Sequence, residues 1–271
     1  MRIGPHPAFR RDWGMDHRID RRRLGLPVLL ETEHELIVVK PSGVATELSR
    51  DHAGTSLISR VDASLPPEVR PRSPHRIDRV SRGIVVVALT RDAVAFHNAQ
   101  IQERRWEKVY LARCLAPMHR SAKEWVGLHR LHLRAQSGRA RVVHSGGKPA
   151  ITEILDVQPA PEADGEVHAL VRLHTGRFHQ IRATLAHLDM PLVDDWLYGQ
   201  SPGRERERFY LEHVALRMTP CASDRPVAVH WHADPDREPM DDALRAALDR
   251  LLQAWENEGA VRVGGFDGEE R

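Results

Sequence analysis

The sequence predicts a globular protein that contains both strands and helices. Of its 271 residues, 41% are apolar, enough to bury a substantial core in one large domain or two small ones. Short β-branched runs alternate along the chain with longer stretches in which apolar residues recur every three or four positions. The first pattern indicates strands and the second indicates amphipathic helices, so we expect a mixed fold.

Strand patterns recur along the chain as short runs that are rich in β-branched residues or alternate apolar with polar side chains. In chain order the expected strands are residues 36–39, 84–89, 107–112, 151–157, 167–173, 210–218 and 227–232. The turn Lys40-Pro41-Ser42-Gly43 ends the first strand. Residues 128–157 are expected to form a hairpin or meander around a turn at residues 145–149.

Helix patterns separate several of these strands. The expected helices are residues 55–65, 91–103, 178–188 and 241–255. Pro66 ends the first helix, and Thr90 is a suitable N-cap for the second. In the second helix we expect Val94, Ala95 and Ile101 to be buried, and in the last helix leucines form the apolar stripe.

The two ends of the chain have different compositions. The first 26 residues lack apolar periodicity, so we expect residues 1–26 to form an arginine-rich arm or a poorly ordered lead-in. Residues 258–271 are acidic, and we expect them to be a disordered tail. Residues 17–20 read HRID, and the same letters recur at residues 75–78. Because three arginines and no strand follow the first copy, we interpret it as a coincidence.

The composition excludes several classes of protein. No apolar run approaches the roughly 18 residues that span a bilayer, and the N-terminus lacks the apolar region of a signal peptide. We therefore expect a cytoplasmic protein that does not bind membranes. Cys114 and Cys221 lie too far apart in sequence to suggest a disulfide framework or a cysteine-built zinc site. The net charge of +2 does not indicate nucleic-acid binding, and the local arginine clusters suit either a phosphate backbone or solvated faces.

The 17 histidines raise the possibility of a metal site. The densest group is His168, His174, His179 and His187, but it contains no HExxH and no pair at i, i+4. The glycine-rich phosphate loops GxxxxGK[ST] and GxGxxG are absent, as is the nucleophile motif GxSxG. We therefore expect no metal site, and a zinc-dependent hydrolase is only a rival hypothesis.

Asp78 is the first candidate functional residue. It lies between Arg76 and Arg79, and Gly83 then opens the expected buried strand at residues 84–89. A carboxylate in this place is either an ion-paired loop residue or a catalytic group held by a rigid scaffold. The residues themselves leave both readings open.

Tyr110 and Arg182 also have more than one interpretation. Alternation in its strand places Tyr110 on the face opposite Val109 and Leu111. A tyrosine so placed is more often a half-buried sheet residue than an active-site group. Arg182 lies beside the apolar face of its helix and can project from it into a cleft.

The segment from His75 to Arg79, with Gly83 and the following apolar strand, resembles the HRLD motif of the RluA family of RNA pseudouridine synthases. Four other segments resemble motifs of this family in the family's order, and together the motifs span most of the chain. They are Lys40-Pro41-Ser42-Gly43, Lys108-Val109-Tyr110-Leu111-Ala112, Gly147-Lys148-Pro149-Ala150-Ile151-Thr152, and the block from Gly176 to Gly199 that reads GRFHQIR…AHL…DWLYG.

The resemblance implies an α+β fold with a mixed, largely antiparallel sheet, a central catalytic cleft and flanking helices. It also implies a catalytic domain at residues 27–257 that isomerises specific uridines of structured ribosomal or transfer RNA, as a monomer and without metal or cofactor. The S4 RNA-binding domain common in the family is expected to be absent, because the first motif begins close to the N-terminus. A non-catalytic RNA-binding or RNA-folding protein that retains the fold is the alternative.

By the same resemblance, three residues carry the chemistry. Asp78 is the catalytic carboxylate, Tyr110 packs on the base and relays a proton, and Arg182 pairs with Asp78. The residues implied to bind RNA or the base are Arg76, Arg79, Arg177, His179 and Ile181. A buried carboxylate needs such a compensating cation to stay ionised. Asp78 either attacks C1′ or removes the C2′ proton, and the sequence leaves both routes open.

The chain departs from the family pattern at two places. Ser81-Arg82-Gly83 stands where the family usually has TSG, and Asp194-Asp195 stands where it usually has Gly-Asp. We expect Arg82 to alter contacts with RNA and Asp194 to change a turn. Neither departure removes a residue with a proposed catalytic role.

Overall fold

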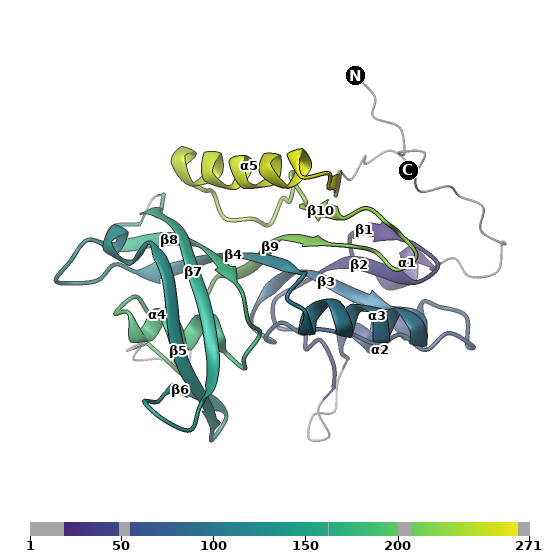
Figure 1. Ribbon diagram of the computed structural model, residues 1–271, viewed down its shortest axis with the longest axis horizontal. Helices are drawn as coiled ribbons and strands as arrows, with labels where there is room; N and C mark the ends of the chain where they lie inside the picture. The colour runs from purple at the N-terminus through teal and green to yellow at the C-terminus, as the bar shows by residue number, and fades with distance from the viewer. Residues whose placement is uncertain (1–18, 49–54, 162, 200–207, 265–271) are drawn as a thin grey trace.

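The computed structural model of the chain describes residues 19–48, 55–161, 163–199 and 208–264. In this part of the chain one mixed sheet of 11 strands forms the framework, and most neighbouring strands are antiparallel (Figure 1). The strands are β1 (Val28–Glu31), β2 (Glu35–Lys40), β3 (Arg82–Ala88), β4 (Glu107–Leu115), β5 (Gly127–Gln136), β6 (Arg139–Val142), β7 (Lys148–Pro159), β8 (Glu166–Leu173), β9 (Leu211–Met218), β10 (Val227–Val229) and β11 (Val261–Val263). The helices are α1 (Arg21–Leu24), α2 (Leu57–Ala63), α3 (Arg91–Gln102), the 3₁₀ helix η1 (Ala122–Trp125), α4 (Gln180–His187) and α5 (Asp242–Asn257). This arrangement confirms the expected α+β class.

Two half-sheets meet at a narrow seam. The first half-sheet is β1-β2-β3, and the second contains β9-β4-β8-β7-β5-β6 with β10 and β11. β3 and β9 pair in parallel over only two residue pairs, Arg82 with Glu212 and Gly83 with His213. Gly83 has φ +110°, and a Cβ there would lie 2.4 Å from the His213 main-chain oxygen. Only glycine therefore allows the two strands to approach this closely.

Apolar clusters cover both faces of the sheet. On one face α2 and α4 pack against a cluster that includes Tyr110 and Ile181. On the other face α5 packs against Val109 and Leu111, and Figure 1 shows α4 and α5 on opposite sides of the sheet. The alternation predicted for β4 is therefore confirmed. Of the described helices, none is long and apolar enough to cross a membrane.

The prediction for the buried face of α3 is only partly correct, although Ile101 does pack against an apolar cluster. Val94 and Ile101 are half-buried and Ala95 is exposed, whereas His97 and Gln100 are fully buried. The His97 ring lies 3.0 Å from a carboxylate oxygen on β2, and the Gln100 amide donates to a main-chain oxygen after β9 at 2.8 Å. Polar side chains occupy this face because they hydrogen-bond to neighbouring strands, which hydrophobic periodicity does not detect.

Both chain ends contain more structure than predicted. Residues 19–26 are not an extended arm, because Asp20 caps α1 and both Ile19 and Leu24 are buried in the core. β11 lies in the expected disordered tail and pairs in parallel with β10. Residues 1–18 and 265–271 lie outside the described residues.

Candidate active site

Asp78 lies in the loop that precedes β3. The neighbouring Ile77 is buried in the core, and its main chain forms two hydrogen bonds with the Thr46 hydroxyl at 3.1 and 3.4 Å. The Ser81 amide donates to the Asp78 main-chain oxygen at 3.1 Å and turns the loop into β3. These contacts hold the loop from within, and the Asp78 side chain remains 22% exposed.

Lys40 fixes the same loop from the end of β2. Its fully buried ammonium group donates to the main-chain oxygens of Pro41, Val44 and Ser81 at 2.9, 2.7 and 2.7 Å. Burial lowers the pKa of Lys40 to about 7, and the negative charge of Asp78 opposes this shift. The turn that follows β2 is thus a structural support for the Asp78 loop.

Arg182 projects from α4 between two carboxylates. Its Nε and Nη2 donate to the two carboxylate oxygens of Asp195, both at 2.7 Å, and its Nη1 donates to Asp78 Oδ2 at 3.3 Å. Burial would lower the pKa of Arg182, but hydrogen bonds and charge from Asp195, with a smaller contribution from Asp78, raise it. A charged guanidinium is therefore held beside Asp78 in a fixed orientation.

His179 completes this cluster. It adopts a left-handed conformation with φ 50° immediately before α4, which places its Nε2 3.8 Å from Asp78 Oδ2. Arg182 Nη1 lies 3.2 Å from His179 Nε2, and Nδ1 lies 3.1 Å from the Tyr198 hydroxyl. Burial lowers the pKa of His179, so its ring is neutral at neutral pH and accepts from Arg182. The guanidinium also lies 5.1 Å from the Tyr198 ring centroid and 5.7 Å from that of Phe209.

Tyr110 lies on the same face of the sheet as this cluster. Its ring stacks on His213 at 4.6 Å with an interplanar angle of 13°. Burial raises the pKa of Tyr110, and the charge of Asp78 raises it further. The phenol is therefore neutral, and its pKa depends on Asp78 although the two residues come from different half-sheets. Ile181 is buried in the same apolar cluster.

The arginines expected to bind RNA have different environments. Arg76 is exposed next to Asp78. Arg79 is exposed, but its Nε donates to the Gly43 oxygen at 2.8 Å. Arg177 is half-buried, and its Nε donates to the Pro149 oxygen at 2.8 Å. Two of these three side chains thus tie motif segments together, in addition to any contact with RNA.

The expectation that Arg82 alters RNA contacts does not fit its position. Its side chain is buried and forms a two-pronged ion pair with Asp234, at 2.9 and 2.8 Å, on the α5 side of the sheet. Asp194 does lie at a turn, as expected. It has φ 55°, a conformation that favours glycine, and its carboxylate accepts from the Arg208 amide at 3.1 Å.

The histidines that suggested a metal site are dispersed. His168 lies 2.9 Å from a Glu238 oxygen, and His174 lies 2.9 Å from a Glu153 oxygen on another part of the sheet. Within the described residues, no group of three or more His, Cys, Asp or Glu side chains is arranged to hold a metal ion.

Three residues of the cluster have no role in the sequence-based prediction. Asp195 orients Arg182, Tyr198 contacts both His179 and Arg182, and Lys40 holds the Asp78 loop. All three lie within the recognised motifs, so position in a motif was the available signal. Their functions depend on long-range contacts that spacing does not reveal.

Comparisons with known proteins find relatives that match most of the chain. A family model described as RNA pseudouridylate synthase matches residues 34–187. The dual-specificity RNA pseudouridine synthase RluA of Escherichia coli O6:H1 is 31% identical over 207 residues, which cover 75% of this chain and 90% of that protein. Ribosomal large subunit pseudouridine synthase C of Vibrio vulnificus is 28% identical over 81% of this chain and 70% of that protein.

A solved structure has a similar fold. Human RNA Pseudouridylate Synthase Domain Containing 1 superposes with a TM-score of 0.65 at 24% sequence identity. The match covers 85% of this chain and 94% of the human one. The likeness supports the architecture of the sheet and its flanking helices.

Proposed function

The chain belongs to the RluA group of the RNA pseudouridylate synthase family, and from this premise we propose that Asp78 is the catalytic carboxylate with which it isomerises uridines of ribosomal or transfer RNA. The observation that carries the proposal is the contact between Asp78 and Arg182. It joins two motifs that lie 104 residues apart in sequence. A surface ion pair of no consequence would not need an arginine that is 4% exposed and held by a second carboxylate.

The reaction breaks the N1–C1′ bond of uridine, rotates the uracil and forms a C1′–C5 bond, after which the C5 proton is released and N1 takes up a proton. Asp78 begins it, either by attacking C1′ or by removing the C2′ proton. Arg182 orients the carboxylate through a hydrogen bond in both routes. Tyr110 and Ile181 form an apolar wall against which the detached uracil is held and from which water is excluded.

The target base must first leave its stack in the RNA. Unstacking costs a few kcal/mol, and stacking on an aromatic side chain returns about 1–3 kcal/mol per base. Tyr110 supplies this surface in our proposal, and the exposed Arg76 fills the gap that the base leaves. Arg79, Arg177 and His179 line the approach to the base.

Tritium release from RNA labelled at uridine C5 tests the proposal. Asp78→Asn should abolish release, on the order of 10⁴-fold or more, because no other group replaces a catalytic carboxylate. Asp20→Asn is the matched control, since it changes the other HRID copy and should leave release unaltered. Full activity of Asp78→Asn would contradict the assignment. Mapping pseudouridine in cellular RNA with and without the gene would identify the target.

A further inference from the structure

Ion pairs on opposite sides of the sheet cross the seam between the half-sheets. On the α4 side, Asp78 of the first half-sheet meets Arg182 of the second. On the α5 side, Arg82 of the first half-sheet meets Asp234, which lies between β10 and α5 of the second. Asp78 and Arg82 belong to one short segment that enters β3. Any shift of this segment across the seam therefore moves both pairs.

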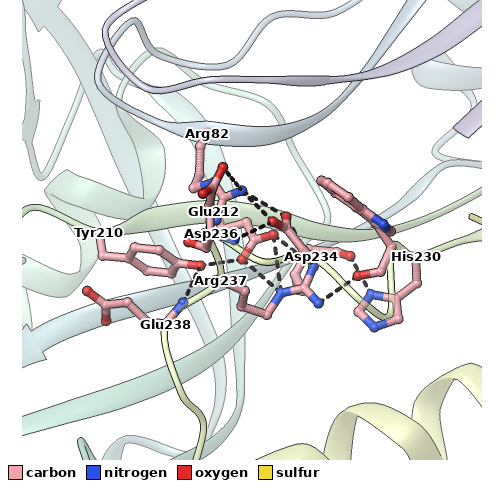
Figure 2. Close-up of polar contacts among 10 residues, drawn as sticks. Arg82, Tyr210, Glu212, His230, Asp234, Asp236, Arg237 and Glu238 are labelled. Carbon is pink, nitrogen blue, oxygen red and sulfur yellow. Dashed lines mark hydrogen bonds and ion pairs between the residues drawn. The ribbon is translucent and has the colours of Figure 1, made fainter. Parts of the chain in front are cut away.

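Figure 2 shows how closely Arg82 is held. Its Nη2 donates to both carboxylate oxygens of Asp234, at 2.9 and 2.8 Å, and its Nη1 donates to the Asp236 main-chain oxygen. The side chains of Arg82 and Asp234 are 11% and 1% exposed. A pair this buried contributes little net stability, because desolvation offsets much of its attraction, whereas losing one partner leaves an uncompensated buried charge.

The loop between β10 and α5, which contains Asp234, is itself attached to β9. Arg237 donates to both carboxylate oxygens of Glu212, its Nη2 at 2.9 Å from Oε1, and its Nη1 donates to the Trp231 main-chain oxygen at 2.7 Å (Figure 2). Glu212 is the strand partner of Arg82 across the seam. The Asp236 amide donates to Asp234 and closes the loop at 3.0 Å. Asp234 is thus a fixed point of the second half-sheet, and Arg82 reaches over to it.

Few other hydrogen bonds cross the seam near Asp78, although the apolar cluster that contains Ile77 and Tyr110 also spans it. His213 Nδ1 lies 2.6 Å from the Ile84 oxygen, and the Gln100 side chain donates to the Thr219 oxygen at 2.8 Å. Both contacts lie further from Asp78 along the chain than Arg82 does. The main-chain pairing consists only of Arg82 with Glu212 and Gly83 with His213. On the α5 side of the sheet, the Arg82–Asp234 pair is therefore the polar side-chain contact across the seam that lies nearest to Asp78 along the chain.

We propose that Arg82 and Asp234 are positioning residues for catalysis, which lock the seam and thereby set the separation of Asp78 and Arg182. The inference rests on the proposed function of Asp78. It assigns a role to the arginine that stands where the family pattern has a small residue. Displacing a catalytic group by about 1 Å can lower a rate about 10²-fold, so a small opening of the seam has a large effect on turnover.

Single substitutions that neutralise the pair test the proposal. Arg82→Gln and Asp234→Asn should each lower kcat for tritium release about 10²-fold, while the Kd for RNA changes less than about threefold. Both residues lie on the face of the sheet opposite Asp78 and Arg182, so turnover and affinity should separate. Combining the two changes should reduce kcat no further than the worse single change, because both remove the same lock.

Arg113→Gln is the matched control. Arg113 forms a comparably buried pair with Glu166 at 2.5 Å and a second pair with Glu238 at 3.1 Å, but all three residues lie within the second half-sheet and its β10–α5 connection. This variant should lose stability as Arg82→Gln does and keep kcat within about threefold of the wild type. An equal loss of kcat in both variants would overturn the proposal, because it would show that any lost buried pair impairs the enzyme.

Two further measurements keep the proposal testable if Arg82→Gln folds poorly. Arg82→Lys retains the charge and should recover part of kcat, whereas no recovery relative to Arg82→Gln in the folded fraction would count against the proposal. Amide hydrogen exchange should be faster at β3 and β9 along the seam in Arg82→Gln, and unchanged exchange there would overturn it. Hydrogen exchange does not depend on activity, so it tests the role of the Arg82–Asp234 pair even if the wild type releases no tritium. Absence of tritium release from the wild type would contradict only the proposed function.

Discussion

The chain contains two HRID segments, and the described part of the first allows a direct comparison with the second. Ile19 and Ile77 are both buried, at 7% and 8% exposure, in the same apolar cluster. The aspartates that follow them differ. Asp20 accepts hydrogen bonds from two amides of its own helix, both at 3.1 Å, whereas Asp78 accepts from Arg182 on a distant helix.

The difference shows what makes an aspartate a candidate catalyst. In both segments the isoleucine anchors the chain and leaves the aspartate near the surface, which is a local effect of sequence. The Asp20 carboxylate accepts hydrogen bonds from the amides in the first turn of α1 and therefore serves as the N-cap of that helix. The carboxylate of Asp78 instead meets a guanidinium from the other half-sheet. The catalytic potential of Asp78 therefore comes from its contact with Arg182 and not from the HRID sequence itself.

The difference between Asp78 and Asp20 depends on Arg182, so the largest effect should come from removing the support of Arg182. Asp195→Asn removes the charge that holds Arg182, and the buried guanidinium is then left with Asp78 alone. We expect kcat to fall about 10²-fold and the free energy of unfolding to fall by about 3 kcal/mol, because breaking a buried ion pair leaves an uncompensated charge. Tritium release and urea unfolding measure the two effects.

The adjacent Asp194→Asn is the control for that change. Asp194 contacts Arg208 at the surface, and asparagine tolerates its left-handed conformation. Its effects should be below about 1 kcal/mol and threefold in kcat. If Asp194→Asn proved as damaging as Asp195→Asn, the support of Arg182 by Asp195 would not explain the loss.

Most of the fold was predictable because its elements carry strong local signals. The β-branched run of β3 and the N-cap of α3 are examples. The polar buried face of α3 was not predictable, because His97 and Gln100 are buried through hydrogen bonds to residues on other elements. The α1 helix was missed because four residues give no periodicity, and its stability depends on a cap and on two apolar side chains that reach the core.

The candidate site was predicted in part by resemblance. Asp78, Arg182 and His179 meet in space, and Tyr110 lies on the same face of the sheet, but their roles await experiment. The role of Asp195 was not predictable, because it depends on which of several nearby charges turns toward Arg182. The same holds for Arg82, whose side chain passes to the α5 side of the sheet.

Low pH should destabilise the fold through His75, the first residue of the second HRID segment. The Val86 amide donates to His75 Nε2 at 2.9 Å, and burial, with the charges of His213, Lys108 and His97, holds the pKa of His75 well below its ordinary value of 6.5. The unfolded chain therefore takes up this proton first as the pH falls. The free energy of unfolding should be constant in this respect above pH 6.5 and decrease below it.

His75→Gln tests this expected loss of stability in acid. The glutamine amide oxygen can still accept the hydrogen bond from the Val86 amide, but it does not titrate. The loss of unfolding free energy below pH 6.5 should be smaller than in the wild type, as measured by urea unfolding across the pH range. An identical slope in the wild type and His75→Gln would show that other groups carry the acid sensitivity.

The smallest expected effect sharpens the comparison most. Asp20→Ala removes an N-cap and should lower the free energy of unfolding by about 1 kcal/mol while kcat stays unchanged. Asp20→Asn keeps a capping oxygen and should restore that stability. The same aspartate-to-asparagine change at residue 78 is expected to abolish turnover, since an amide can cap a helix but cannot act as a nucleophile or base at the sugar. Loss of activity in Asp20→Ala, with folding intact, would mean that the first segment also serves the reaction.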